Sequence, residues 1–531
     1  MKFSQSNIDA VQATQAHPSH LLAFSLAGLR SIISFPSSTS CIIYVLERPS
    51  VVFPPLSHTL SYRPSSTNTS SNWILTKPKT TITNIPTLDE WKCLWKAWDL
   101  VTLQMIPREM LLQKPIDLRH KCLFYLGHIP TFLDMLLSKA IGGEATEPKF
   151  FWDIFERGID PHVDDVLKVG DALGEGVHCH KHSIVPEKDE DWPQLESIIG
   201  FRNGVRARLA QLYDDLDTGK RVLTRNIART LVMTHEHEAM HIETLLYMLI
   251  QRAGTGTLPP PGFTVPPWSA LAAQWASVPP PSTATVTLGP ADLPVGHVDS
   301  EADDADVHEI YNVHDREYGW DNESPARVVC VGKFKAEWRP VSNGEFERYW
   351  TASAGKVAMP RSWVVDEDGE VKVRTMYGPV PMYVAQHWPV LTAYDDLCAY
   401  AKSRGGRLPT EAELRLFLNE YEVGYEGGGN SGFRNWHPVP ATAGLDENQG
   451  RGSNGGVWEW TSTLFDGHEG LVPTNLFVGY SADFFDSKHQ VVLGSSYATI
   501  PRLERKTFRN FYQHNYPYAW VAARVVYDVE N

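Results

Sequence analysis

Residues 234–244 have the sequence THEHEAMHIET, and this stretch indicates both a fold and a chemistry. It lies within residues 222–252, where apolar side chains recur every three or four positions, as on one face of an α-helix. His237 and His241 are four residues apart, so on a helix both imidazoles project from the same side. The spacing therefore predicts two ligands for one metal ion.

Three further segments upstream, at residues 91–105, 118–137 and 195–216, show the same helical period. Four such segments predict an up-down four-helix bundle. The second segment contains FYLGHIP at residues 124–130, which places His128 on an otherwise apolar stripe. We predict that His128 joins His237 and His241 as a third ligand on a facing helix. Three imidazoles suit zinc or ferrous iron, and the spacing alone favours neither.

The histidine pair has two other interpretations. Residues 237–241 match the HExxH pattern of zinc hydrolases, in which Glu238 would be the general base. That class needs a third ligand downstream, whereas this segment continues as LLYML at residues 245–249. Alternatively, the two histidines are core residues whose hydrogen bonds are satisfied inside the bundle.

The amino-acid composition excludes several classes of binding partner. The chain has 531 residues, and 48 Lys and Arg against 63 Asp and Glu give a net charge of −15. This acidic balance argues against nucleic acid or an anionic membrane surface, so we expect small-molecule substrates. No run of 18 apolar residues occurs, which argues against a transmembrane segment. The six cysteines form no CxxC pair, which is typical of an intracellular enzyme, and we expect a cytoplasmic location.

Composition also divides the chain. Residues 1–85 are rich in Ser, Thr and Pro, hold few charges and show no sustained period, so we predict a disordered tail, with an organelle transit peptide as the alternative. The predicted bundle occupies residues 86–252. Proline runs at 259–261, 266–267 and 279–281 predict a linker over residues 253–283.

Residues 284–531 differ from the predicted bundle in composition and in hydrophobic periodicity. They contain short β-like runs at 328–334, 371–375 and 490–493, with many glycines and aromatic residues. RLPTEAE at residues 407–413 predicts a helix start, with Thr410 as N-cap and Glu413 three residues later. We therefore expect an α+β protein of two domains, a helical bundle followed by an irregular mixed domain.

The motifs of both domains match known families. The second domain resembles the formylglycine-generating-enzyme (sulfatase-modifying-factor) fold, which is C-type-lectin-like, through RLPTEAE, VWEWT at 457–461, RNFY at 509–512 and AAR at 522–524. The first resembles the DinB-like four-helix bundle through LGHIP and HEAMHIET. Their combination over residues 88–531 resembles the ergothioneine-pathway sulfoxide synthases, and IPREML, FYLGHIPTFLD, FERGIDP and EHEAMHIETLLYML resemble the fungal form.

The resemblance implies that His128, His237 and His241 bind a non-haem ferrous iron. The reaction it implies joins the sulfur of a thiol to the imidazole C2 of trimethylhistidine (hercynine) and oxidises the sulfur with dioxygen. It also implies substrate contacts from the bundle through Arg157 and Asp160 of FERGID, at residues 155–160. On the second domain the candidate contacts are Trp458, Arg509, Asn510, Tyr512 and Tyr516. The rings of Trp458 and Tyr512 are suited to the trimethylammonium group, and core packing is the favoured alternative for Trp458.

Two departures from the bacterial members bear on substrate and mechanism. Members that use γ-glutamylcysteine carry an Asp and an Arg after the RNW-like motif, where this chain has Tyr512 and Tyr516, so cysteine is the expected thiol. Their active-site tyrosine after VWEWT is absent here, since STLF follows at residues 462–465. Tyr480 is the candidate catalytic tyrosine in its place, and a loop aromatic without a catalytic role is the alternative.

Fungal members usually carry a methyltransferase that makes the trimethylhistidine. Residues 1–85 are too short to hold one, so we expect this chain to perform only the C–S bond step. An inactive paralogue that serves as a binding module is the alternative. Formylglycine generation is not expected, because it needs a cysteine pair late in the domain and the last cysteine here is Cys398.

Overall fold

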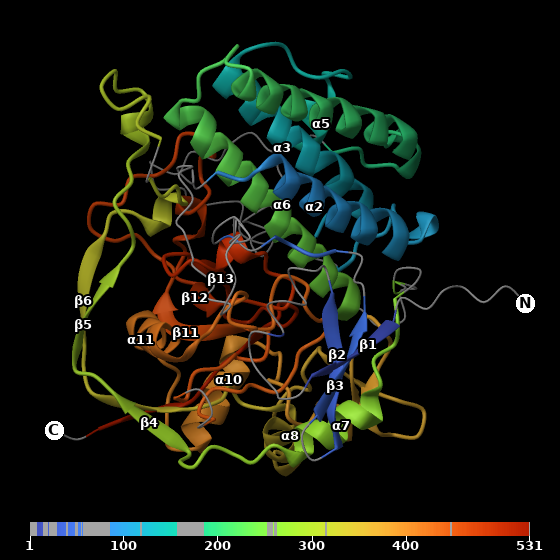
Figure 1. Ribbon diagram of the computed structural model, residues 1–531, viewed down its shortest axis with the longest axis vertical. Coiled ribbons are helices and arrows are strands. Elements are labelled where there is room, and N and C mark those ends of the chain that lie inside the picture. The colour runs from blue at the N-terminus through green and yellow to red at the C-terminus, as the bar shows by residue number, and fades with distance from the viewer. Residues whose placement is uncertain are drawn as a thin grey trace, which may run out of the picture.

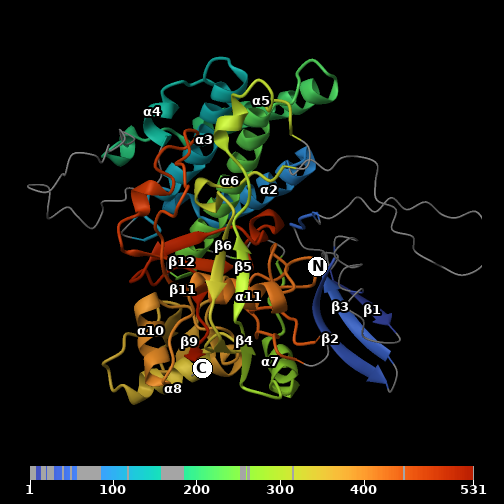
Figure 2. The ribbon, with the colours of Figure 1, turned by 90° about the vertical axis from the view of Figure 1, so that its left-hand side faces the viewer.

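The computed structural model describes residues 8–13, 20, 29–38, 41–47, 51–54, 56, 85–116, 119–156, 185–251, 257, 259, 263–313, 316–445 and 449–529. A layer of long helices lies above a domain of short strands and helices, and a small separate sheet flanks the lower domain (Figures 1 and 2). The predicted α+β class, a bundle followed by a mixed domain, is confirmed.

The upper layer is a bundle of four long helices, close to the four predicted segments. They are α2 (Leu88–Leu100), which continues into a π-helical turn (Val101–Met105), α3 (Cys122–Ile141), α5 (Leu195–Asp217) and α6 (Arg225–Gln251). A short helix, α4 (Phe151–Phe155), follows α3. Thr87 and Glu90 form a capping box that fixes the start of α2. None of the described helices is both long and apolar enough to cross a membrane.

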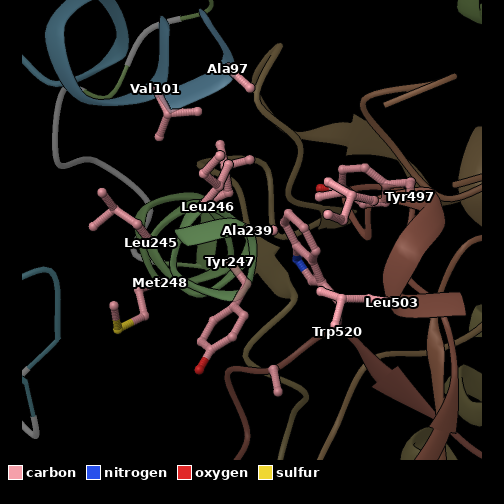
Figure 3. Close-up of a cluster of buried hydrophobic side chains, with 14 of the residues drawn as sticks. Ala97, Val101, Ala239, Leu245, Leu246, Tyr247, Met248, Tyr497, Leu503 and Trp520 are labelled. Atoms are coloured by element: carbon pink, nitrogen blue, oxygen red, sulfur yellow. The ribbon is translucent and has the colours of Figure 1, made fainter. Parts of the chain in front are cut away.

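Helix α6 is the shared core of the molecule. Nearly all of its residues are buried, because the bundle covers one side and the C-terminal domain covers the other. Figure 3 shows α6 end-on, with Ala97 and Val101 of α2 and the adjoining turn on one side and Tyr497 and Trp520 of the C-terminal domain on the other. A helix that is buried all round holds the two domains in one hydrophobic core.

The C-terminal domain is built from small sheets. One has the order β13-β12-β11-β14 and another the order β15-β7-β4, while β8 to β10 form a third and β5 pairs with β6. Among these pairs β11 and β14 are parallel and the others antiparallel. The strands are β4 (Thr285–Leu288), β5 (Ala291–Val295), β6 (Arg327–Val331), β7 (Phe334–Glu337), β8 (Trp363–Val365), β9 (Val371–Val373), β10 (Val380–Pro381), β11 (Trp458–Leu464), β12 (His489–Gly494), β13 (Asn510–Gln513), β14 (Val521–Ala522) and β15 (Val526–Asp528).

Four helices accompany these strands: α8 (Asn343–Ala352), α9 (Met382–Ala385), α10 (Tyr394–Ser403) and α11 (Glu411–Tyr421). The predicted cap of α11 is confirmed, because Thr410 and Glu413 form a reciprocal capping box.

Within the predicted linker lies a helix that the sequence analysis did not predict. Helix α7 (Trp268–Ser277) starts directly after Pro266 and Pro267, at a position where the missing N–H of proline costs nothing. Its Trp268 and Trp275 rings lie 5.8 Å from the ring of Trp388, so α7 packs on the C-terminal domain. The proline runs start this helix instead of excluding one. The proposed domain limits at residues 86, 252 and 283 remain predictions.

Residues 8–47 also differ from the expectation of a tail without strands. β1 (Ile8–Ala13), β2 (Arg30–Ser38) and β3 (Cys41–Glu47) form an antiparallel sheet in the order β1-β3-β2. The sequence of β3, CIIYVLE, is a continuous apolar and β-branched run, which favours a strand although it does not alternate with polar residues. Because these residues do not alternate between apolar and polar, no strand was predicted for this segment. Residues 57–84 lie outside the described part of the chain.

Replacing Gly127 in α3 tests this packing. A Cβ at Gly127 would lie 2.6 Å from ring atoms of the buried Phe155. Overpacking of this kind costs about 1–3 kcal/mol, against at most about 1 kcal/mol gained by removing a helical glycine. We therefore expect Gly127→Ala to lower the free energy of unfolding, measured by urea denaturation. Gly200→Ala in α5 is the control, since nothing lies within 4 Å of a Cβ there. This change should instead raise the free energy by about 0.5–1 kcal/mol, and equal effects at the two sites would contradict the packing.

Candidate metal centre

The three predicted ligands lie together in the structure. His128 of α3 and His237 and His241 of α6 are buried, and one nitrogen of each ring lies within 4.8 Å of the others. Their ring centres are 5.2 Å (His128 to His237), 4.9 Å (His128 to His241) and 4.5 Å (His237 to His241) apart. In the described part of the chain this is the one group of His, Cys, Asp or Glu side chains with such a geometry.

The protonation of these imidazoles suits a metal ligand. His128 Nδ1 donates to the carbonyl oxygen of Phe155 at 2.7 Å, which leaves Nε2 as the lone-pair nitrogen. Burial lowers the pKa of His128 to about 4. Burial, and secondarily the neighbouring histidines, also lower the pKa values of His237 and His241 well below the usual range. All three rings are therefore neutral near pH 7.

Two ring nitrogens at the centre lack hydrogen bonds. Nδ1 of His237 and Nδ1 of His241 are buried and have no partner among the described residues. Buried ring nitrogens without partners are costly, and a cation that accepts the lone pairs of the three rings would offset part of that cost. The residues present thus fit a metal ion, and a set of three nitrogens suits zinc or ferrous iron.

Aromatic rings surround the three histidines. Phe132 of α3 stacks on His237 with ring centres 3.9 Å apart, and Phe477 lies 5.9 Å from the same ring. Phe124 stacks on His128 at 5.5 Å. Tyr125 lies 5.8 Å from His241. These rings keep bulk water from most of the site's perimeter and lower the local dielectric constant.

Tyr480 lies at the edge of this site. Its ring stacks on Trp320 at 3.9 Å and lies 5.8 Å from Phe477. Its hydroxyl is 3.9 Å from Sδ of Met240, the residue directly before His241. Burial, with the nearby carboxylates, raises the pKa of Tyr480 well above the usual range, so the phenol stays protonated.

Glu238 does not take the position that a zinc hydrolase needs. Its carboxylate lies 3.9 Å from Arg206 of α5. The other charges that act on it come from Asp99 of α2 and Arg202 of α5, while burial raises its pKa to about 7. Glu238 is therefore directed toward α2 and α5, whereas His237 contacts Phe132 and Phe477. This geometry disfavours the hydrolase interpretation.

Three of the predicted substrate residues lie beside one another. The rings of Tyr512 and Tyr516 are parallel, 6.0 Å apart, and each lies 6.1 Å from Tyr247 of α6. Asn510 Nδ2 is 3.5 Å from the hydroxyl of Tyr512.

Two other predicted substrate residues have structural partners. Arg509 forms a buried ion pair with Glu411 at 3.0 Å, and Trp458 Nε1 donates to Glu243 of α6 at 2.5 Å. Arg157 and Asp160 lie outside the described residues. The substrate role of all seven residues stays a prediction.

Comparison with known proteins agrees with this architecture. Residues 94–245 match the DinB superfamily, and residues 292–529 match the sulfatase-modifying factor enzyme 1-like domain. The chain joins these two domains. The resemblance of each half that the motifs indicated is therefore confirmed.

The chain is also similar to proteins with curated names. Ergothioneine biosynthesis protein 1 of Neurospora crassa is 37% identical over 84% of this chain and 58% of its own length. The protein of the same name from Schizosaccharomyces pombe is 36% identical over 83% of this chain and 56% of its own length. Hercynine oxygenase of Mycobacterium tuberculosis is 30% identical over 39% of this chain and 56% of its own length. The chain thus spans little more than half the length of these relatives, and the resemblance to the fungal form is confirmed.

Two glutamates that the sequence motifs do not single out join the DinB domain to the C-terminal domain. Glu236 of α6 accepts a hydrogen bond from Trp320 Nε1 at 2.8 Å and forms an ion pair with Arg505. Glu243 accepts from Trp458 and, at 2.8 Å, from the hydroxyl of Thr499. A signal was present in the sequence, since two glutamates seven residues apart share one face of a helix whose apolar period predicts burial.

Loss of one of the three candidate ligands should weaken metal binding. We expect His237→Ala to weaken Fe(II) binding by roughly 100-fold or more, because even partners of ligands contribute about 10–100-fold. Bound Fe(II) is measured by colorimetric chelation after anaerobic loading and desalting. His235→Ala is the matched control, since His235 is buried on the same helix but packs edge-on against Trp91 at 4.9 Å. Equal iron retention by the two variants would contradict the site.

Proposed function

We propose that this chain catalyses iron-dependent, dioxygen-consuming C–S bond formation between hercynine and cysteine, which gives hercynylcysteine sulfoxide in ergothioneine biosynthesis. The observation that carries the proposal is the group of three buried histidines between the bundle and the C-terminal domain. The names of the relatives, ergothioneine biosynthesis protein 1 and hercynine oxygenase, support it. One oxygen atom enters the sulfoxide, and the other leaves as water with the thiol proton and the imidazole C2 proton.

Ferrous iron is the proposed metal, held by His128, His237 and His241. Bound there, it would supply dioxygen activation and a site for the thiolate, and a set of three neutral ligands leaves other coordination positions open for substrates. The rings of Phe132 and Phe477 exclude water from the side of His237.

Tyr480 is the proposed proton donor. Its phenol is protonated, and the stack on Trp320 holds the ring at the edge of the site. The indole of Trp320 is in turn fixed by Glu236, the neighbour of His237. The position of the Tyr480 hydroxyl is therefore coupled to that of a metal ligand.

The proposed substrate contacts are Arg157, Asp160, Trp458, Arg509, Asn510, Tyr512 and Tyr516. Tyr512 and Tyr516 pack against Tyr247, and neither of the two carries a charge that could bind the γ-glutamyl group. These uncharged side chains support cysteine over γ-glutamylcysteine. We also propose a cytoplasmic location, supported by the cysteine pattern, and small-molecule partners only, supported by the net charge of −15.

Reconstitution tests the proposed reaction. The full chain is loaded anaerobically with Fe(II) and mixed with hercynine, cysteine and air-saturated buffer, while dioxygen uptake and product mass are followed. We expect uptake that needs both substrates and a product of the mass of their sulfoxide adduct, both lost in His128→Ala. No uptake with cysteine, γ-glutamylcysteine or histidine in any pairing would overturn the proposal.

Tyr480→Phe tests the proton donor. Loss of a positioned acid lowers rates by about 10²–10⁴-fold, so we expect kcat to fall within that range while Fe(II) binding is retained. Tyr311→Phe is the control, because Tyr311 is 62% exposed at the surface. A Tyr480→Phe enzyme with the wild-type kcat and product would remove Tyr480 from the chemistry.

A further inference from the structure

A cluster of tyrosines around one arginine lies next to the metal centre. We name it the tyrosine cluster; it consists of Arg119, Tyr125, Tyr247, Tyr512 and Tyr516. Tyr125 comes from α3 and Tyr247 from α6, while Tyr512 lies on β13 and Tyr516 follows it. The cluster thus lies where the two domains meet. Figure 3 shows the Tyr247 ring leaving α6 with its hydroxyl directed away from the helix.

The guanidinium of Arg119 contacts the tyrosines of the cluster. Its Cζ lies 5.1 Å from the centre of the Tyr516 ring. The hydroxyl of Tyr516 is 3.3 Å from that of Tyr247. The positive charge of Arg119 interacts with the hydroxyls of Tyr125, Tyr247 and Tyr516, and these interactions raise the pKa of the guanidinium despite its burial. Arg119 is therefore a permanent cation in contact with phenol groups.

Tyr125 connects the cluster to the metal centre. Its side chain is 1% exposed, and its ring centre is 5.8 Å from that of His241. The buried hydroxyl has no hydrogen-bond partner among the described residues. A buried hydroxyl without a partner is costly, so a ligand that completes its hydrogen bonding would be favoured there.

A cation and neutral hydroxyls together form a site for a carboxylate. Burial raises the pKa values of Tyr125, Tyr247 and Tyr516, so all three remain protonated donors at neutral pH. A guanidinium binds a carboxylate with two parallel hydrogen bonds, and the low dielectric constant of the interior strengthens the attraction.

We propose that Arg119, with the hydroxyls of Tyr125, Tyr247 and Tyr516, binds the α-carboxylate of an amino-acid substrate while the reacting end of that substrate lies at the three histidines. This inference rests on the proposed function. Cysteine and hercynine both carry an α-carboxylate, so the shared chemistry defines the subsite and the experiment separates the two sources.

The test compares substrates with and without the carboxylate. Dioxygen uptake by the iron-loaded full chain gives KM and kcat for cysteine against cysteamine, and for hercynine against its decarboxylated analogue trimethylhistamine. A hydrogen-bonded charge contributes about 1.5–3 kcal/mol, which corresponds to about 10–140-fold in affinity. We expect Arg119→Gln to raise the KM of one carboxylate-bearing substrate by that factor and to leave the KM of its carboxylate-free analogue unchanged.

The substrate whose KM rises identifies the source of the carboxylate. Arg119→Lys, which keeps the charge, should recover part of the loss. Tyr125→Phe should raise the same KM by a smaller factor. Tyr497→Phe is the matched control, because Tyr497 is also buried against α6 but packs on Trp520, outside the cluster. Its KM values should equal those of the wild type.

Two outcomes separate this inference from the proposed function. Wild-type turnover with unchanged KM values for cysteine and hercynine in Arg119→Gln would overturn the subsite alone. No turnover by the wild type would overturn the proposed function. In that case, calorimetric titration of the iron-loaded protein with cysteine and with hercynine decides the subsite. Heat of binding that Arg119→Gln removes would support it, and heat that is equal in both proteins, or absent from both, would overturn it.

Discussion

Two buried carboxylates on α6 hold this helix, with its two candidate metal ligands, against the C-terminal domain. Glu236 accepts from the indole of Trp320 and from Arg505, and Glu243 accepts from the indole of Trp458 and from Thr499. A carboxylate buried without such partners would cost several kcal/mol, so these bonds must form whenever the domains pack together. His237 and His241 lie between the two anchors, and their position relative to the C-terminal domain follows from them.

The candidate site therefore belongs to neither domain alone. The bundle supplies the histidines, together with Phe132 and Tyr125, and the C-terminal domain supplies Phe477, Tyr480 and the tyrosine pair of β13. The hydrophobic core is continuous across the boundary, which lets side chains from distant parts of the chain keep fixed distances around one point. The proposed reaction of a thiol, an imidazole and dioxygen needs such fixed positions, because orientation contributes much of the rate.

Expectations from the sequence succeeded where the signal was local and failed where it was not. The helices of the bundle follow from apolar periodicity within single segments, and the cap of α11 follows from two residues three apart. α7 was missed because proline was taken as a helix breaker, although it precedes the first turn. β3 was missed because an apolar run without alternation fits a strand as well as a buried helix.

The sequence by itself determined the bundle and its three candidate ligands, because a spacing of four on a helix and one histidine on an apolar stripe are properties of short segments. Only the tertiary structure decided that Glu238 is directed to Arg206, that Tyr480 stacks on Trp320, and that Arg119 lies among tyrosines of both domains. These arrangements join residues far apart in the chain, as do Glu243 and Trp458, which are separated by 215 positions. Such contacts arise from the packing of whole elements, and no local pattern of residues encodes them.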